Sequence, residues 1–133
     1  MVDKQAIEAG RHRTEEWYRS GQLNCSEAVF LVGMGMAGCA CGALTGCIMA
    51  LGLKYGRSQA GAEKPGMFEA AKELHDRFVK RRGHACCRIL VRGIRPDSLE
   101  LIEHCSAIIG EVAADVIELL ARDGERIQKK EKA

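Results

Sequence analysis

Aromatic side chains are scarce in this chain of 133 residues, at 5% of the total. Glycine, in contrast, occurs 15 times. A core with so few rings must be built from aliphatic and small side chains, which let backbones approach each other closely. The composition therefore favours closely packed helices.

A strong net charge is also lacking, since the formal charge at pH 7 is only +2. Part of the basic excess lies in a tail that begins at about residue 124. This tail holds no aromatic residue that could stack on a base. We therefore expect the tail to be solvated and the protein to have no nucleic-acid partner.

The start of the chain, residues 1–6, lacks the apolar stretch of a secretory signal, so we expect a cytoplasmic protein. Residues 28–53 carry no charge, and a stretch of that length must be tested as a membrane span. Gly33, Gly35 and Gly38 divide it into two shorter pieces, and its flanks have no clear aromatic belt. We therefore expect no membrane span but two core helices joined by a glycine-rich turn.

Length and composition indicate one domain over residues 1–133, because a second core would have too few side chains. A helix is predicted over residues 3–19. Residues 24–27 resemble a capping box, which would place Cys25 in the first turn of a second helix. Residues 41–53 are apolar on all sides and predict a buried central helix that ends near residue 55.

Apolar residues at three- and four-residue steps predict an amphipathic helix over residues 67–82, stopped by Gly83. Residues 57–66 are expected to form a loop, and residues 84–91 are too few to separate a helix from a strand. A last helix begins after Pro96 with Asp97 or Ser98 as its cap. The expected fold is thus all-α: a small helical bundle of about five helices around a central apolar helix.

Permanent disulfides are not expected among the seven cysteines, because the cytosol is reducing and an odd number cannot pair completely. Intracellular cysteine-rich domains more often use their thiols for metal binding or redox chemistry. The chain lacks the Cys-x2-Cys spacing of zinc ribbons, a phosphate-binding loop and a Gly-x-Ser-x-Gly motif. What remains is a dispersed set of thiols that a helical bundle could bring together.

Four cysteines are the candidates for one shared site: Cys25, Cys41, Cys87 and Cys105. The first two lie at predicted helix starts, and so does Cys87 if its segment is helical. Partial positive charge at a helix start favours the thiolate, which ligates metals and attacks disulfides. Cys105 lies on the apolar face of the last helix, where a buried structural thiol is nearly as reasonable.

The other three cysteines are assigned different roles. Cys47 lies six residues after Cys41, on another helix face, and is interpreted as a buried structural thiol. Cys86 and Cys87 are adjacent, so only one of them is expected to serve the site. Cys39 could be a resolving thiol or an alternative ligand.

The ordered cysteine motifs resemble those of a known family. They are Asn24-Cys25-Ser26-Glu27-Ala28-Val29, Cys41-Gly42-Ala43-Leu44-Thr45-Gly46, Cys87-Arg88-Ile89-Leu90 and the single Cys105. They are similar to the C_GCAxxG_C_C family of small proteins described as redox-active, which has four hallmark cysteines. The resemblance implies that Cys25, Cys41, Cys87 and Cys105 are this set, and thus selects Cys87 over Cys86.

The same family is similar to the C-terminal region of split-Soret cytochromes, whose cysteines hold an iron–sulfur cluster. The resemblance therefore implies such a cluster here. No haem is expected, because the chain has no Cys-x-x-Cys-His motif. Whether Cys25 or Cys39 completes the site stays open.

The leading hypothesis is a redox-active protein that binds an iron–sulfur cluster or another metal through Cys25, Cys41, Cys87 and Cys105. It would act in electron transfer or redox sensing. The alternative is a thiol–disulfide oxidoreductase in which an exposed catalytic thiolate, Cys41 or Cys25, attacks a disulfide. A further alternative is a structural helical module that binds zinc or no cofactor. We expect a homodimer, the commonest oligomer, and an unidentified electron-transfer partner.

Overall fold

The computed structural model describes residues 3–20, 38–55 and 66–131. The five helices in this part of the chain are α1 (Lys4–Arg19), α2 (Gly42–Tyr55), α3 (Met67–Arg82), α4 (Cys87–Leu90) and α5 (Leu99–Glu131). The described residues contain no strand, only one isolated antiparallel bridge between Ala40 and Cys86. The prediction of an all-α bundle of about five helices is confirmed.

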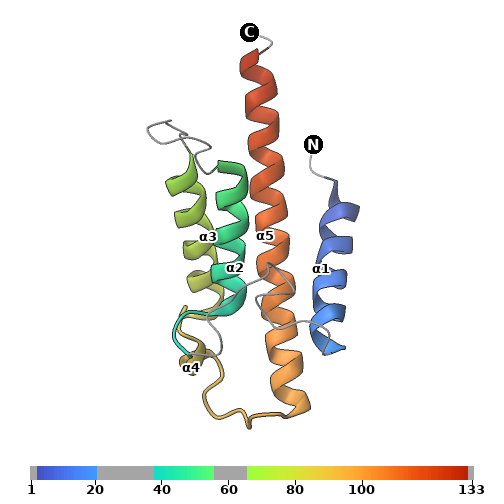
Figure 1. Cartoon of the computed structure of the whole chain (residues 1–133), viewed down its shortest axis with the longest axis vertical. Helices are drawn as coiled ribbons and strands as arrows, with labels where there is room; N and C mark the ends of the chain where they lie inside the picture. The colour runs from blue at the N-terminus through green and yellow to red at the C-terminus, as the bar shows by residue number, and fades with distance from the viewer. Residues whose placement is uncertain (1–2, 21–37, 56–65, 132–133) are drawn as a thin grey trace.

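Helix α5 lies at the centre of the arrangement, with α1 on one side and α2 and α3 on the other (Figure 1). The apolar helix α2, predicted to be central, does bury seven of its residues. It packs to one side of α5, however, and leaves Met49 and Leu53 exposed. The central position falls to α5 because it is the longest helix and contacts α1, α2 and α3.

Local signals mark several helix ends, and the sequence predicts those at Ser98 and Gly83. Asp3 caps α1 by accepting a hydrogen bond from the backbone N–H of Gln5 at 2.9 Å. Ser98 caps α5 by accepting one from the N–H of Leu101 at 3.1 Å. Gly83 ends α3 with a φ of +84°, a left-handed conformation that favours glycine.

Helix α5 is longer than predicted. It has 33 residues and continues to Glu131, through the segment expected to be a solvated basic tail from about residue 124. The helical backbone there is consistent with the high helix propensity of its Glu, Arg, Gln and Lys residues. The charged end of the chain is therefore a continuation of the bundle's central helix.

One core joins α2, α3 and α5. Phe78, Leu51, Leu74 and Leu119 are at most 1% exposed and lie in the same cluster of buried side chains. The apolar face of α5 that carries Cys105 also places four side chains in this core: Ile108, Val112, Val116 and Leu119. This core sets the positions from which the cysteines project.

Close approach of α1 and α5 depends on glycine, as the composition predicts. A Cβ atom on Gly10 would lie 2.6 Å from Cδ1 of Ile117, and one on Gly110 would lie 2.8 Å from Cγ of Glu15. Glu15 is itself buried against α5, and its carboxylate accepts hydrogen bonds from Arg11 and Arg19. Because Gly110 has no side chain, it leaves room for this buried carboxylate, whose charge is balanced by Arg11 and Arg19.

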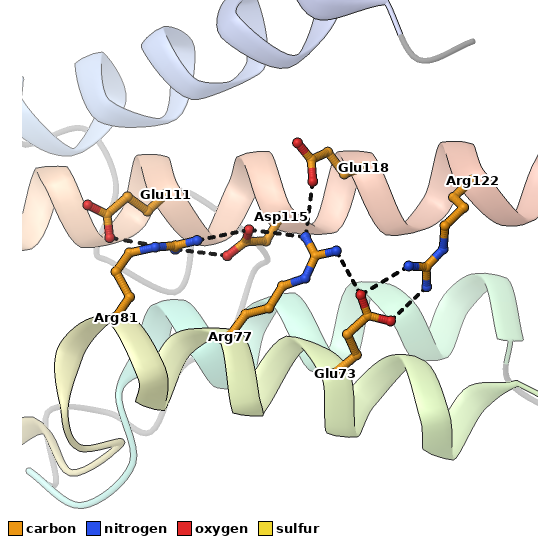
Figure 2. A network of polar contacts seen from close by, with 7 residues as sticks. All are labelled: Glu73, Arg77, Arg81, Glu111, Asp115, Glu118 and Arg122. Carbon is orange, nitrogen blue, oxygen red and sulfur yellow. Dashed lines mark hydrogen bonds and ion pairs between the residues drawn. The ribbon is translucent and has the colours of Figure 1, made fainter.

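Seven charged residues hold α3 against α5, and we call them the α3–α5 network: Glu73, Arg77, Arg81, Glu111, Asp115, Glu118 and Arg122 (Figure 2). At its centre Asp115, 6% exposed, accepts hydrogen bonds from Arg81 at 2.9 and 3.1 Å and from Arg77 at 3.4 Å. In the N-terminal half of α3, Glu73 accepts two hydrogen bonds from Arg122, at 3.0 and 2.7 Å. Charges that would otherwise oppose packing thus join the two helices.

Acid should weaken this network through Glu73. Hydrogen bonds from Arg122 and then Arg77 lower the pKa of Glu73 from 4.5 to about 2. A lowered folded-state pKa stabilises the fold above the unfolded-state value, and this contribution is lost as the pH falls from about 4.5 to about 2. We expect the melting temperature of the wild type to fall more steeply over that range than that of Glu73→Gln.

Thermal unfolding followed by circular dichroism at several pH values measures this difference. Glu69→Gln, an exposed carboxylate one turn earlier on α3, is the matched control. Parallel pH profiles for wild type and Glu73→Gln would contradict the assignment.

Several predictions lie outside the described residues: the capping box at 24–27, most of the glycine-rich turn and the loop at 57–65. No described helix has both the length and the apolar character needed to cross a bilayer.

Candidate cysteine site

A single backbone pairing positions two of the predicted site cysteines. This pairing is the antiparallel bridge between Ala40 and Cys86. On one side of the bridge, the N–H of Cys41 donates to the carbonyl of Ala85 at 2.8 Å. On the other side, the N–H of Cys87 donates to the carbonyl of Cys39 at 2.5 Å. The residues that follow the bridge begin α2 and α4. The segment before α2 and the segment before α4 are therefore joined, although they are 46 residues apart in sequence.

Cys41 occupies the cap position of α2. Its carbonyl accepts the first helical hydrogen bond, from the N–H of Thr45 at 3.0 Å. Its sulfur accepts hydrogen bonds from the backbone N–H groups of Leu44 and Ala43. The thiol thus takes the place that a serine or threonine oxygen takes in an ordinary N-cap.

Cys105 reaches the same region from α5. It lies one turn before the buried Ile108 and Ile109, and its side chain is half-buried. The Tyr18 hydroxyl of α1 donates a hydrogen bond to its sulfur. Cys105 is therefore not simply a small core residue, because a polar group from another helix meets it.

Three of the four predicted site cysteines come together. Cys41, Cys87 and Cys105 lie near enough to one another that a charge on one thiol would raise the pKa of another. They belong to three different helix starts or faces, on α2, α4 and α5. The fourth, Cys25, lies outside the described residues.

Burial raises the pKa of these thiols, which is the opposite of the effect expected from a helix start. It raises the pKa of Cys41, and the N–H groups of Leu44 and Ala43 offset only part of this rise. Burial also raises the pKa of Cys87, helped by Cys86, and that of Cys105, where the hydrogen bond from Tyr18 acts in the opposite direction. The expectation that helix starts favour the thiolate is therefore wrong for the free thiols of Cys41 and Cys87, because desolvation is the largest effect on both pKa values.

The burial of Cys41 also bears on thiol exchange. Its side chain is 7% exposed, so the predicted exposed attacking thiolate at this position is wrong. The reason is the N-cap geometry, which directs the sulfur back onto the first turn of α2, inside the core.

The remaining described cysteines differ in burial, and the prediction that Cys47 is buried is confirmed. Cys47 is fully buried, and burial raises its pKa strongly, as suits a structural thiol. Cys39 is exposed. Cys86 is half-buried, and its thiol donates to the carbonyl of Gly38 at 3.6 Å.

Sequence reasoning missed two residues around the site. Tyr18 contacts Cys105 from the other end of the chain, and no sequence signal links positions 87 residues apart. The positive charge of Arg82 lies close enough to Cys41 to offset a small part of the rise in the pKa of that thiol. Arg82 is fixed in turn by Glu111, at 2.6 and 3.0 Å.

No group of three His, Cys, Asp or Glu side chains in the described part of the chain is arranged to hold a single metal ion. A zinc ion binds its ligands at about 2.0 to 2.3 Å and needs them close together. The three gathered thiols therefore do not form a mononuclear site by themselves.

The fold and the cysteine cluster define a small all-α protein with several thiols gathered beside the start of α2. A model of one protein family matches residues 15–119, under the description "Putative redox-active protein (C_GCAxxG_C_C)". The chain belongs to this family, and the resemblance noted in its sequence is confirmed. Neither the curated proteins nor the solved structures contain a significant match.

Proposed function

We propose that this redox-active protein holds an iron–sulfur cluster through Cys41, Cys87 and Cys105, with Cys25 as the fourth ligand, and transfers electrons or senses redox state. The observation that carries the proposal is that three thiols from separate parts of the chain lie close enough for a charge on one to raise the pKa of another. Iron–sulfur clusters are held by such cysteine thiolates.

A four-iron cluster and a single zinc ion require different spacings of their thiolates. In a four-iron cluster each thiolate binds its own iron atom, so the sulfurs need not be as close as around one zinc ion.

Because burial raises the pKa of the three thiols, a bound metal would have to displace their protons. Buried thiols are costly to ionise alone, whereas a bound metal replaces the lost hydration and stabilises the thiolate. The hydrogen bonds from Ala43, Leu44 and Tyr18 to the sulfurs would then tune the reduction potential.

Anaerobic purification followed by visible absorption and by iron and sulfide analysis tests the proposal. We expect a coloured protein with iron and acid-labile sulfide in similar amounts. A colourless protein that stays free of iron after reconstitution would refute it, and stoichiometric zinc would favour the structural alternative. The same preparations, analysed by size-exclusion chromatography, test the expected homodimer.

A further inference from the structure

The bridge also brings a second pair of cysteines, Cys39 and Cys87, close together, and Cys39 is exposed at the surface. The N–H of Cys87 donates to the carbonyl of Cys39 at 2.5 Å. Standard bond lengths then leave at most about 7 Å between the two Cα atoms. Disulfides join cysteines whose Cα atoms lie about 4.4 to 6.8 Å apart, so the backbone already holds this pair at bonding range.

The two thiols differ in how a reagent can reach them. Cys39 is the exposed one among the described cysteines, whereas Cys87 is half-buried and interacts with Cys41 and Cys105. Cys39 lines a surface depression of about 310 Å³ with Gly38, Ala40, Ala85, Cys86 and Arg88. A small molecule therefore meets Cys39 first.

We propose that Cys39 and Cys87 form a thiol–disulfide exchange site that takes a low-molecular-weight disulfide as its oxidant. The Cys39 thiolate attacks one sulfur of the disulfide RSSR, forming the Cys39–SR bond, breaking the S–S bond and releasing RS⁻. The Cys87 thiolate then attacks the Cys39 sulfur, forming the Cys39–Cys87 disulfide and releasing a second RS⁻.

The exchange is balanced in atoms and electrons. The two cysteine thiols lose two electrons, RSSR gains them, and the two released thiolates take up the two protons that Cys39 and Cys87 lose. Arg88 lines the same depression, and its positive charge favours a disulfide that carries carboxylates.

Cys86 is the obvious competitor, and its surroundings argue against it. It is half-buried, and its thiol donates its proton to the carbonyl of Gly38. In the antiparallel pairing Cys86 stands opposite Ala40, whereas Cys87 stands opposite Cys39. Resolution by Cys87 also links the surface to the cluster of three thiols, because its oxidation removes one of them.

The test uses the full chain, reduced and free of iron, so it does not depend on whether a cluster binds. The protein is exposed anaerobically to glutathione disulfide, quenched with acid and alkylated, and its intact mass is determined. We expect the wild type to lose two alkylatable thiols without retaining glutathione. Cys87→Ser is expected to retain one glutathione, and Cys39→Ser is expected to form no internal disulfide.

Cys86→Ser is the matched control, because it removes a thiol from the same depression, and it is expected to behave as the wild type. Circular dichroism of each variant verifies the helical fold. An internal disulfide that persists in Cys39→Ser or in Cys87→Ser would overturn the proposal. So would its loss in Cys86→Ser. Absence of iron in the wild type would refute the proposed cluster and leave this result unchanged.

Discussion

Replacing Cys41 by serine is expected to abolish cluster binding while leaving the bundle folded. The serine oxygen can accept the same hydrogen bonds from Ala43 and Leu44, so the cap of α2 is preserved. The thiolate ligand is lost. Changes to groups that only support a ligand already cost about 10- to 100-fold in metal affinity, so loss of a ligand should cost at least as much.

Anaerobic reconstitution followed by iron and sulfide analysis measures this effect. Cys41→Ala separates the two roles of the residue, because it removes both ligand and cap and should also cost about 1 kcal/mol of unfolding free energy. Cys86→Ser is the control with an unchanged iron content, since Cys86 is not a proposed ligand. Full iron retention in Cys41→Ser would exclude Cys41 from the site.

The helices were largely predictable because their signals are local. Residues 67–82 show a three- and four-residue apolar period and a following glycine, and α3 has these bounds. Ser98 was one of two predicted caps of α5, and it does cap that helix. By contrast, the interruption of the apolar pattern near residue 124 hid the continuation of α5, whose charged residues are nevertheless good helix formers.

The site was only partly predictable, because its geometry is non-local. The family resemblance identifies the candidate cysteines, and three of them, Cys41, Cys87 and Cys105, do lie near one another. The bridge between Ala40 and Cys86, which sets Cys39 opposite Cys87, involves too few residues to leave a periodic pattern. The burial that raises the pKa of Cys41 depends on α3 and α5, which the sequence around residue 41 does not reveal.

The same non-local character makes Asp115 a sensitive position. Its carboxylate is buried between two arginines of α3, and nothing in the sequence near residue 115 indicates partners 34 and 38 residues away. Asp115→Ala is expected to lower the unfolding free energy by about 2 to 3 kcal/mol. Breaking a fully buried pair costs about 3 to 5 kcal/mol, but Arg77 and Arg81 are 30% and 38% exposed and can regain water.

Urea unfolding of the two proteins measures the loss as a lower midpoint with an unchanged slope. Glu118→Ala is the control on the same helix: it also removes a partner of Arg77, but its side chain is 50% exposed, so it should cost less than about 1 kcal/mol. Equal losses in the two variants would mean that burial does not strengthen the Asp115 contacts. A larger loss in Asp115→Ala places the main electrostatic link between α3 and α5 at this residue, and through α3 it supports the segment that carries Cys87.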